Sequence, residues 1–144
     1  MSEFSQDYLH YLLAQTSAAV SETFHAKLAS QRIPAGEWRV LASLHPDLEL
    51  SVGELAKECL IKPSTLSRTL DRLESNKLLA REHTHLDRRQ VRVGLTTKGR
   101  VLACKLIEQA REQEQLFLKN YSAEDIARLK TLLRELTARA TKPD

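Results

Sequence analysis

Apolar residues recur at helical spacing along the N-terminal part of the chain. Over residues 4–30 they fall four positions apart, with one interruption at Thr16. This period predicts one long amphipathic helix. The helix should end at Ile33, because the residue before Pro34 is pushed out of the α-helical region. The stripe consists of Phe4, Tyr8, Leu12, Val20, Phe24 and Leu28.

Three shorter helices are expected next. Trp38 and Leu41 belong to a helix over about residues 35–45, which ends before a proline. Ser51 followed by Glu54 is a capping box and predicts the start of a second short helix. After a turn at residues 60–62, Pro63 suits the first position of a third helix that extends to about residue 76.

The pattern changes to period two over residues 79–96, which predicts a β-hairpin. Its tip is Leu86-Asp87-Arg88-Arg89. Helical spacing returns over about residues 98–119, and Ser122 can cap a last helix. The order helix, helix, short helix, tight turn, helix, hairpin, helix, helix contains a winged helix-turn-helix in its middle.

The predicted fold is therefore mainly α: a winged helix-turn-helix domain with one two-stranded wing, flanked by N- and C-terminal dimerisation helices. We expect an N-terminal dimerisation helix over residues 1–32, a DNA-binding lobe over residues 33–96 and C-terminal dimerisation helices over residues 97–144. The terminal helices carry apolar stripes that one small core cannot cover, and a second copy of the chain would cover them.

Charge is concentrated in the middle of the chain, although the net charge is only +3. Between Lys62 and Arg100 there are ten lysines and arginines against four acidic residues, whereas residues 1–61 have four against eight. Such a basic block is either a solvated surface or a surface that binds a polyanion. Its place on the winged helix-turn-helix favours DNA.

The expected DNA contacts lie on the third short helix and at the hairpin tip. Hydroxyl groups near the start of that helix let the backbone approach the bases, and Arg68 can donate two hydrogen bonds to a guanine. Arg72, one turn further on, suits a phosphate. The predicted DNA-binding residues are Lys62, Ser64, Thr65, Ser67, Arg68, Arg72, Asp87, Arg88 and Arg89.

Two adjacent arginines at a hairpin tip contribute little to folding, because exposed charges are screened. They can instead enter a narrow, strongly negative DNA groove. Asp87 can pair with Arg89 and hold its guanidinium extended. Lys98 and Arg100 should lie near the base of the wing.

These residues resemble the MarR family of bacterial regulators. The wing sequence Asp87-Arg88-Arg89-QVRVG-Leu95-Thr96 followed by Gly99, the run PSTLSRTLDRLESNKLLAR and the W-x-x-L of Trp38 and Leu41 are similar to that family over essentially the whole chain. The resemblance implies a homodimer that binds a pseudo-palindromic operator in double-stranded DNA and is released by an effector. The chain has Lys77 where the family usually has glycine, and Asn76 is the expected left-handed residue instead.

The resemblance also implies a small-molecule site, suited to a small aromatic acid, between the dimer helices and the DNA-binding lobe. Arg39 is a candidate partner for a carboxylate, or for a salt bridge with Glu37 or Asp7, and Trp38 is a candidate for stacking. The candidate effector-binding residues are His10, Tyr11, Ser17, Trp38 and Arg39.

Other chemistry has little support in the sequence. His83, His85 and Asp87 are too few for a metal site, and Cys59 and Cys104 are expected to be small buried residues rather than redox sensors. No nucleophile–base pair or phosphate-binding loop indicates an enzyme, and no cofactor is expected. No membrane span or signal peptide is visible, so the cytoplasm is the expected compartment.

Three alternatives stay open at this point. The chain could be a winged-helix protein-interaction module that does not bind DNA, although the basic block argues against it. It could also be a regulator that needs no effector, or one that responds through a thiol. The expected function is a sequence-specific transcriptional repressor.

Overall fold

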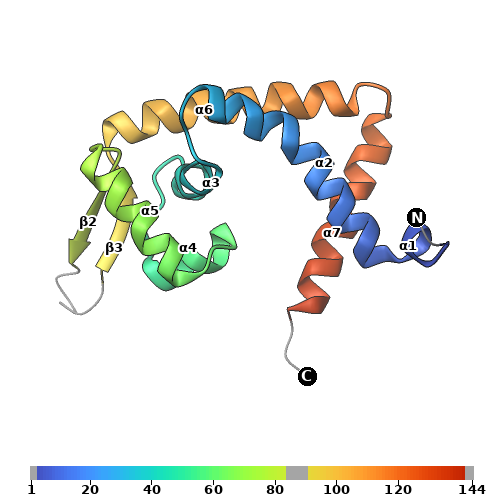
Figure 1. Cartoon of the computed structure of the whole chain (residues 1–144), viewed down its shortest axis with the longest axis horizontal. Helices are drawn as coiled ribbons and strands as arrows, with labels where there is room; N and C mark the ends of the chain where they lie inside the picture. The colour runs from blue at the N-terminus through green and yellow to red at the C-terminus, as the bar shows by residue number, and fades with distance from the viewer. Residues whose placement is uncertain (1–2, 84–90, 142–144) are drawn as a thin grey trace. The chain divides into compact units, whose positions relative to one another are not determined.

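The computed structural model of the chain describes residues 3–83 and 91–141. The elements are α1 (Glu3–Asp7), α2 (Leu9–Ser30), α3 (Ala35–Leu44), β1 (Leu50–Ser51), α4 (Val52–Cys59), α5 (Pro63–Ser75), β2 (Leu79–His83), β3 (Val91–Leu95), α6 (Thr97–Leu118) and α7 (Ala123–Ala140). They form two compact units, Met1–Ala110 and Arg111–Asp144. This arrangement is the predicted winged helix-turn-helix fold, with helices before and after it (Figure 1).

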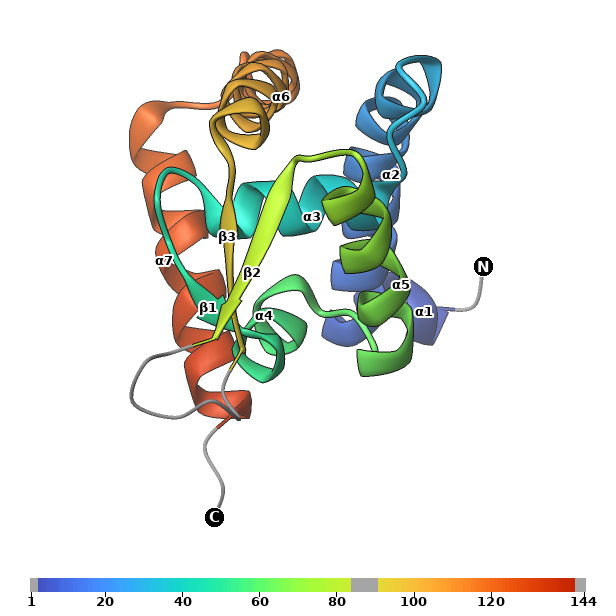
Figure 2. The same cartoon turned by 90° about the vertical axis from the view of Figure 1, so that its left-hand side faces the viewer.

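The first unit is built around a small antiparallel sheet in the order β1-β3-β2. Leu50 of β1 pairs with Val93, and Leu79 of β2 pairs with Leu95. Figure 2 shows the three strands side by side, with α3 and α4 behind them and α5 beside β2. The hairpin of β2 and β3 confirms the predicted wing strands, whereas the two-residue strand β1 was not predicted.

The core lies between α3, α4, α5, the sheet and the start of α6. Its fully buried side chains are Leu28, Val40, Leu41, Leu44, Leu55, Leu66, Leu70, Leu73, Leu79, Val93 and Leu106. The predicted inner stripe of α5 is confirmed, because its three leucines are buried there. Leu60, at the turn between α4 and α5, is 86% exposed and lies outside this core.

Two local expectations of backbone conformation also differ from the structure. The predicted first helix is divided at Tyr8, whose φ of −73° and ψ of 113° are extended. Lys77, not Asn76, takes the left-handed conformation after α5, with φ 59°. The backbone N–H of Lys77 donates to the carbonyl oxygen of Glu74, and this turn ends α5. The hydrogen bond involves backbone atoms only, so it does not require a particular side chain at position 77.

The second unit comprises the end of α6 and all of α7. Ser122 caps α7, since its hydroxyl accepts a hydrogen bond of 3.0 Å from the backbone N–H of Asp125. Lys130 of α7 pairs with Glu114 of α6 at 2.9 Å. None of the residues of α7 is buried. Within the part of the chain that the structure describes, no helix has the length and apolar character needed to cross a bilayer.

Candidate nucleic-acid interface

Helices α4 and α5 form the helix-turn-helix, and the residues at their ends explain its tight turn. Ser51 caps α4 through the predicted capping box: its hydroxyl accepts from the N–H of Glu54, whose carboxylate accepts from the N–H of Ser51 at 2.8 Å. These hydrogen bonds, the backbone one first, hold the pKa of Glu54 below its usual range. Leu60 ends α4 in the left-handed conformation, and Pro63 begins α5.

Helix α5 has one buried and one exposed face. Because its leucines at positions 66, 70 and 73 are in the core, the opposite side faces outward. The six predicted DNA-binding residues on this helix and at its N-cap are exposed together: Lys62, Ser64, Thr65, Ser67, Arg68 and Arg72. Such a surface presents hydroxyl groups and guanidinium groups to a major groove.

Ion pairs from both strands of the wing hold it against the helix-turn-helix. The guanidinium of Arg81 in β2 lies 2.6 Å from Asp71 and 3.7 Å from Glu74, both in α5. In β3, Arg92 lies 3.1 Å from Glu54 of α4 and donates a hydrogen bond to the carbonyl oxygen of residue 49. The wing is therefore fixed in direction relative to α5, and sequence spacing alone did not indicate these partners.

Hydrogen bonds join the base of the wing and the start of α6 to the backbone that follows α5. Lys98 donates to the carbonyl oxygen of Asn76 at 3.0 Å, and Thr96 donates to that of Lys77 at 2.7 Å. Arg100 pairs with Asp47 at 3.1 Å. Lys98 and Arg100 thus lie near the base of the wing, as predicted.

The tip of the wing lies outside the described residues. Residues 84–90 include Asp87, Arg88 and Arg89, three of the predicted DNA contacts, together with His85. Their expected roles stay predictions. Among residues 3–83 and 91–141, no three histidine, cysteine or acidic side chains are close enough together to hold a metal ion.

Glu37 of α3 is a buried charged residue that lies behind the exposed face of α5, next to the core. It is 7% exposed, and its Oε1 atom lies 2.8 Å from Nε of Arg72 on α5. Burial raises the pKa of Glu37, and the charge of Arg72 offsets only part of this effect. The sequence suggested Glu37 as a partner of Arg39, but it is on the side of α3 that contacts α5.

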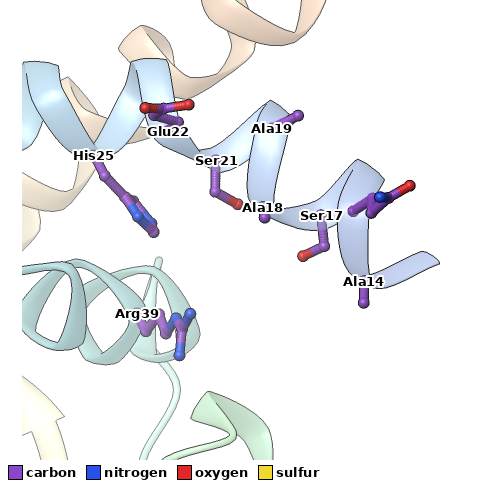
Figure 3. Close-up of a pocket in the computed structure, with 9 residues that line it drawn as sticks. Ala14, Ser17, Ala18, Ala19, Ser21, Glu22, His25 and Arg39 are labelled. Atoms are coloured by element: carbon purple, nitrogen blue, oxygen red, sulfur yellow. The ribbon is translucent and has the colours of Figure 1, made fainter. Parts of the chain in front are cut away.

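A groove of about 870 Å³ lies between α2 and α3 of the first unit. In Figure 3, Ser17, Ser21 and His25 of α2 point towards α3, and Arg39 lies across from His25. Backbone and small side chains of α2 make up most of the remaining wall. The lining residues are Ala14, Gln15, Ser17, Ala18, Ala19, Ser21, Glu22, His25 and Arg39.

The five candidate effector residues are only partly brought together. Ser17 and Arg39 line the groove. Trp38 instead packs edge-to-face on Phe24, with ring centroids 5.2 Å apart. His10 and Tyr11 are exposed nearer the start of α2 and are not part of the lining. His25, one turn after Ser21, points into the groove, and Glu22 is also among its lining residues. The sequence had not singled out either residue for this site.

The two cysteines differ in their surroundings. Cys59 is buried as predicted, and burial raises the pKa of its thiol. Cys104 is exposed, so the expectation of a buried residue is wrong. The apolar neighbours that suggested burial were Val101, Leu102 and Ile107, but Val101, one turn before Cys104, is itself 68% exposed. The Sγ atom of Cys104 is 3.3 Å from Nε2 of His45.

Comparisons with known proteins agree with this geometry. Residues 33–91 match the model of the MarR family. The chain is 30% identical over 124 residues to the transcriptional regulator PecS of Dickeya dadantii, covering 84% of this chain and 75% of that protein.

Solved structures extend the likeness over nearly the whole chain. The MarR family regulator SPO1453 of Silicibacter pomeroyi is 35% identical, with a TM-score of 0.85 over 96% of this chain and 99% of the other. BpsR of Bordetella bronchiseptica, whose DNA binding is regulated by 6-hydroxynicotinic acid, is 26% identical with a TM-score of 0.81 over 95% and 97% of the two chains. The chain belongs to the MarR family of transcriptional regulators.

Proposed function

We propose that the chain is a repressor that reads a pseudo-palindromic operator with α5 and steadies the complex with its wing. The observation that carries this proposal is the outward face of α5, where six polar or basic side chains are exposed together. The buried leucines of the same helix fix that face relative to the core. The ion pair of Arg81 with Asp71 fixes the wing beside it.

Within this proposal the residues of α5 have different roles. Arg68 reads a base, because a guanidinium matches the O6 and N7 atoms of guanine. Ser64, Thr65 and Ser67 allow close approach to the base edges. Arg72 and Lys62 bind phosphates, which sets the register of the protein on DNA. Arg88 and Arg89, oriented by Asp87, are assigned to the minor groove beside the major-groove contact.

The working form in this proposal is a homodimer. Many large apolar side chains at both ends of the chain are exposed, and a second copy would bury them. The dimer would place two α5 helices about 34 Å apart, one turn of DNA, as a two-fold operator requires. The exposed side chains include Phe4, Tyr8, Leu9, Leu12, Leu13, Leu129, Leu132, Leu133 and Leu136.

The groove between α2 and α3 is the proposed effector site. Arg39 can bind a carboxylate, and the ring of His25 across from it can contact an aromatic ring. These groups suit a small aromatic acid, the chemical class of the 6-hydroxynicotinic acid that regulates BpsR. Thermal-shift titration with aromatic acids tests this site. Arg39→Ala should abolish any rise in the unfolding midpoint that the parent chain shows.

The DNA-binding surface is tested by Arg68→Ala in a mobility-shift titration on the DNA upstream of the chain's own gene. The variant should bind this DNA more weakly by roughly 1–3 kcal/mol and should discriminate less against unrelated DNA. Arg111→Ala, which removes an equal charge from an exposed position on α6, is the control. Unchanged affinity of Arg68→Ala would refute the assignment of α5.

A salt series separates this proposal from a protein-interaction module. A DNA-binding dimer should lose affinity steeply as salt rises, because each neutralised phosphate releases counterions. A module that docks a protein would show no such binding even at low salt.

A further inference from the structure

Glu37 is an unusual residue for the place it occupies. Its side chain is only 9% exposed, and acidic side chains are almost never buried unless they are paired. Its Oε1 atom is close to Arg72, but it accepts no aligned hydrogen bond from any of the described residues. The contact is therefore ionic. The Glu37 carboxylate and the Arg72 guanidinium lie next to each other without an aligned hydrogen bond.

Burial opposes the charged form of Glu37, and a buried ion pair of this kind often contributes little to stability. Burial raises the pKa of Glu37 more than the charge of Arg72 lowers it. A neutral side chain of the same shape would therefore fit this position at least as well as the carboxylate. Groups that are retained at a cost to stability are typical of functional sites.

The two partners differ in mobility. Glu37 precedes Val40 and Leu41 by one turn of α3, and both are fully buried in the core. Its neighbour Gly36 lies against α5, since a Cβ atom there would be 3.7 Å from Oγ1 of Thr69. The carboxylate is thus held on a rigid helix. Arg72, whose side chain is 58% exposed, is the flexible partner.

The atom of Arg72 that faces Glu37 is also informative. It is Nε, the guanidinium nitrogen nearest the aliphatic stem, that lies 2.8 Å from the carboxylate. The terminal Nη atoms lie further along the side chain, which is 58% exposed. An end-on guanidinium presents two parallel N–H donors, the geometry that binds a phosphate group.

We propose that Glu37 is a positioning residue of the DNA interface: it fixes Arg72 by its Nε side so that the two Nη groups are presented to a phosphate of the operator. This inference rests on the proposed function of α5. It adds that a buried carboxylate on α3, which touches no DNA, sets the affinity through an arginine on α5. Because Glu37 orders the long Arg72 side chain before DNA binds, less conformational entropy is lost when this side chain is fixed at the interface.

The sign of the mutational effect separates this role from simple electrostatics. Glu37→Gln removes a negative charge, and long-range electrostatics alone would then tighten the binding of a polyanion. The positioning role requires the opposite result. Glu108→Gln, at an exposed position of α6, removes the same charge away from α5 and is the matched control.

The experiment measures affinity for the upstream DNA and for unrelated duplex DNA by fluorescence anisotropy, on the full chain. Glu37→Gln and Glu37→Met should each bind both DNAs at least about threefold more weakly, within the range of coupling between contacting residues. Loss of a phosphate contact acts on all sequences alike, so the ratio of the two affinities should stay constant. The thermal unfolding midpoint of both variants should be equal to that of the parent chain or higher. Weaker DNA binding without a loss of stability is a result that a merely structural role of Glu37 would not give.

A double variant completes the test. Arg72→Ala should weaken binding, and adding Glu37→Gln to it should change the affinity no further. Unchanged or tighter binding by Glu37→Gln, or weakening that persists without Arg72, would overturn the positioning role. If Arg68→Ala weakens binding and Arg72→Ala does not, the positioning role is refuted while α5 keeps its function. If neither arginine matters, the proposed function itself fails.

Discussion

The guanidinium of Arg81 in β2 lies 2.6 Å from the carboxylate of Asp71 in α5, so an ion pair joins the wing to the proposed recognition helix. Both side chains are partly exposed, at 30% and 67%. An exposed ion pair contributes little to stability because water and salt screen it. Its effect on the direction of the wing is the greater consequence, since Arg81 pairs with both Asp71 and Glu74 of α5.

This pair makes the first prediction. Asp71→Asn and Arg81→Gln, alone and combined, should give a coupling of about 0.2–1 kcal/mol in the free energy of unfolding, measured with urea. The coupling should fall at high salt, because charge screening weakens an exposed pair. A coupling that high salt leaves unchanged would show that the two residues interact in some other way.

Gly99 is a position where any side chain would collide with backbone. A Cβ atom there would lie 1.8 Å from the carbonyl oxygen of Leu78, and this oxygen accepts a hydrogen bond from Thr96. Gly99→Ala should therefore lower the free energy of unfolding by about 3 kcal/mol or more, since neither backbone segment can move freely. Urea denaturation followed by circular dichroism measures the change.

Gly53 of α4 supplies the matched control for this second prediction. A Cβ atom at Gly53 would meet nothing within 4 Å. Gly53→Ala should stabilise the chain by roughly 0.5–1 kcal/mol, because alanine loses less conformational entropy in a helix. Equal effects of the two substitutions would contradict the close packing of Gly99 against Leu78.

Lys77 is strained, and this makes the third prediction. Its φ of 59° is in the left-handed region, which costs a residue with a Cβ atom roughly 1–2 kcal/mol. Lys77→Gly should raise the thermal midpoint, whereas Lys77→Ala, which keeps the Cβ atom, should leave it nearly unchanged. The same shift in both variants would show that the side chain, not the backbone, is responsible.

Much of the fold follows from the sequence because the strongest signals are local. The leucines of α5 at positions 66, 70 and 73 repeat at helical spacing, and the capping box of Ser51 with Glu54 marks the start of α4 directly. These features depend on residues within one turn of each other. The exposed face of α5 could be predicted for the same reason.

Features that depend on distant residues could not be predicted in this way. Strand β1 has two residues, and only its pairing with Val93 makes it a strand. The partners of Arg81 and Arg92 are set by how the wing folds back on α4 and α5. The sequence suggested Arg39 as the partner of Glu37, but the side of α3 on which Glu37 lies brings it to Arg72 of α5. Burial of Cys104 was expected from neighbours in sequence, but packing turned it outward.

Glu37 gives the fourth prediction, a pH dependence of stability. Because burial raises the pKa of Glu37 above its ordinary value of 4.5, the folded chain binds this proton more tightly than the unfolded chain does. The stabilisation from protonation is complete below pH 4.5 and is lost as pH rises through the raised pKa. The parent chain should thus gain stability relative to Glu37→Gln as pH falls from neutral towards that window.

The measurement for Glu37 is urea denaturation of the two chains across that pH range. The difference between them isolates Glu37, because all other titrating groups are common to both. Glu54→Gln serves as the opposite case. The pKa of Glu54 is lowered by its hydrogen bonds with Ser51, so its contribution is lost as pH falls through the lowered pKa. A parent chain that loses stability relative to Glu37→Gln on acidification would contradict the raised pKa.

The fifth prediction concerns the two thiols. Cys104 is exposed beside His45, whereas Cys59 is buried and hydrogen-bonded at 3.5 Å to Ser43. The thiolate is the reactive form, and burial raises the pKa of Cys59, so this thiol is both shielded and less ionised. Iodoacetamide at neutral pH should therefore alkylate Cys104 first.

Mass spectrometry of tryptic peptides follows the two sites separately. Cys59 should stay unmodified in the folded chain and react at once in urea, because unfolding removes both its shielding and its raised pKa. In Cys104→Ser, labelling of the folded chain should nearly stop, and Cys59→Ser should leave the labelling rate as it was. Equal labelling of the two cysteines in the folded chain would mean that α4 opens on the time scale of alkylation, and that the core around Cys59 is less closed than its burial indicates.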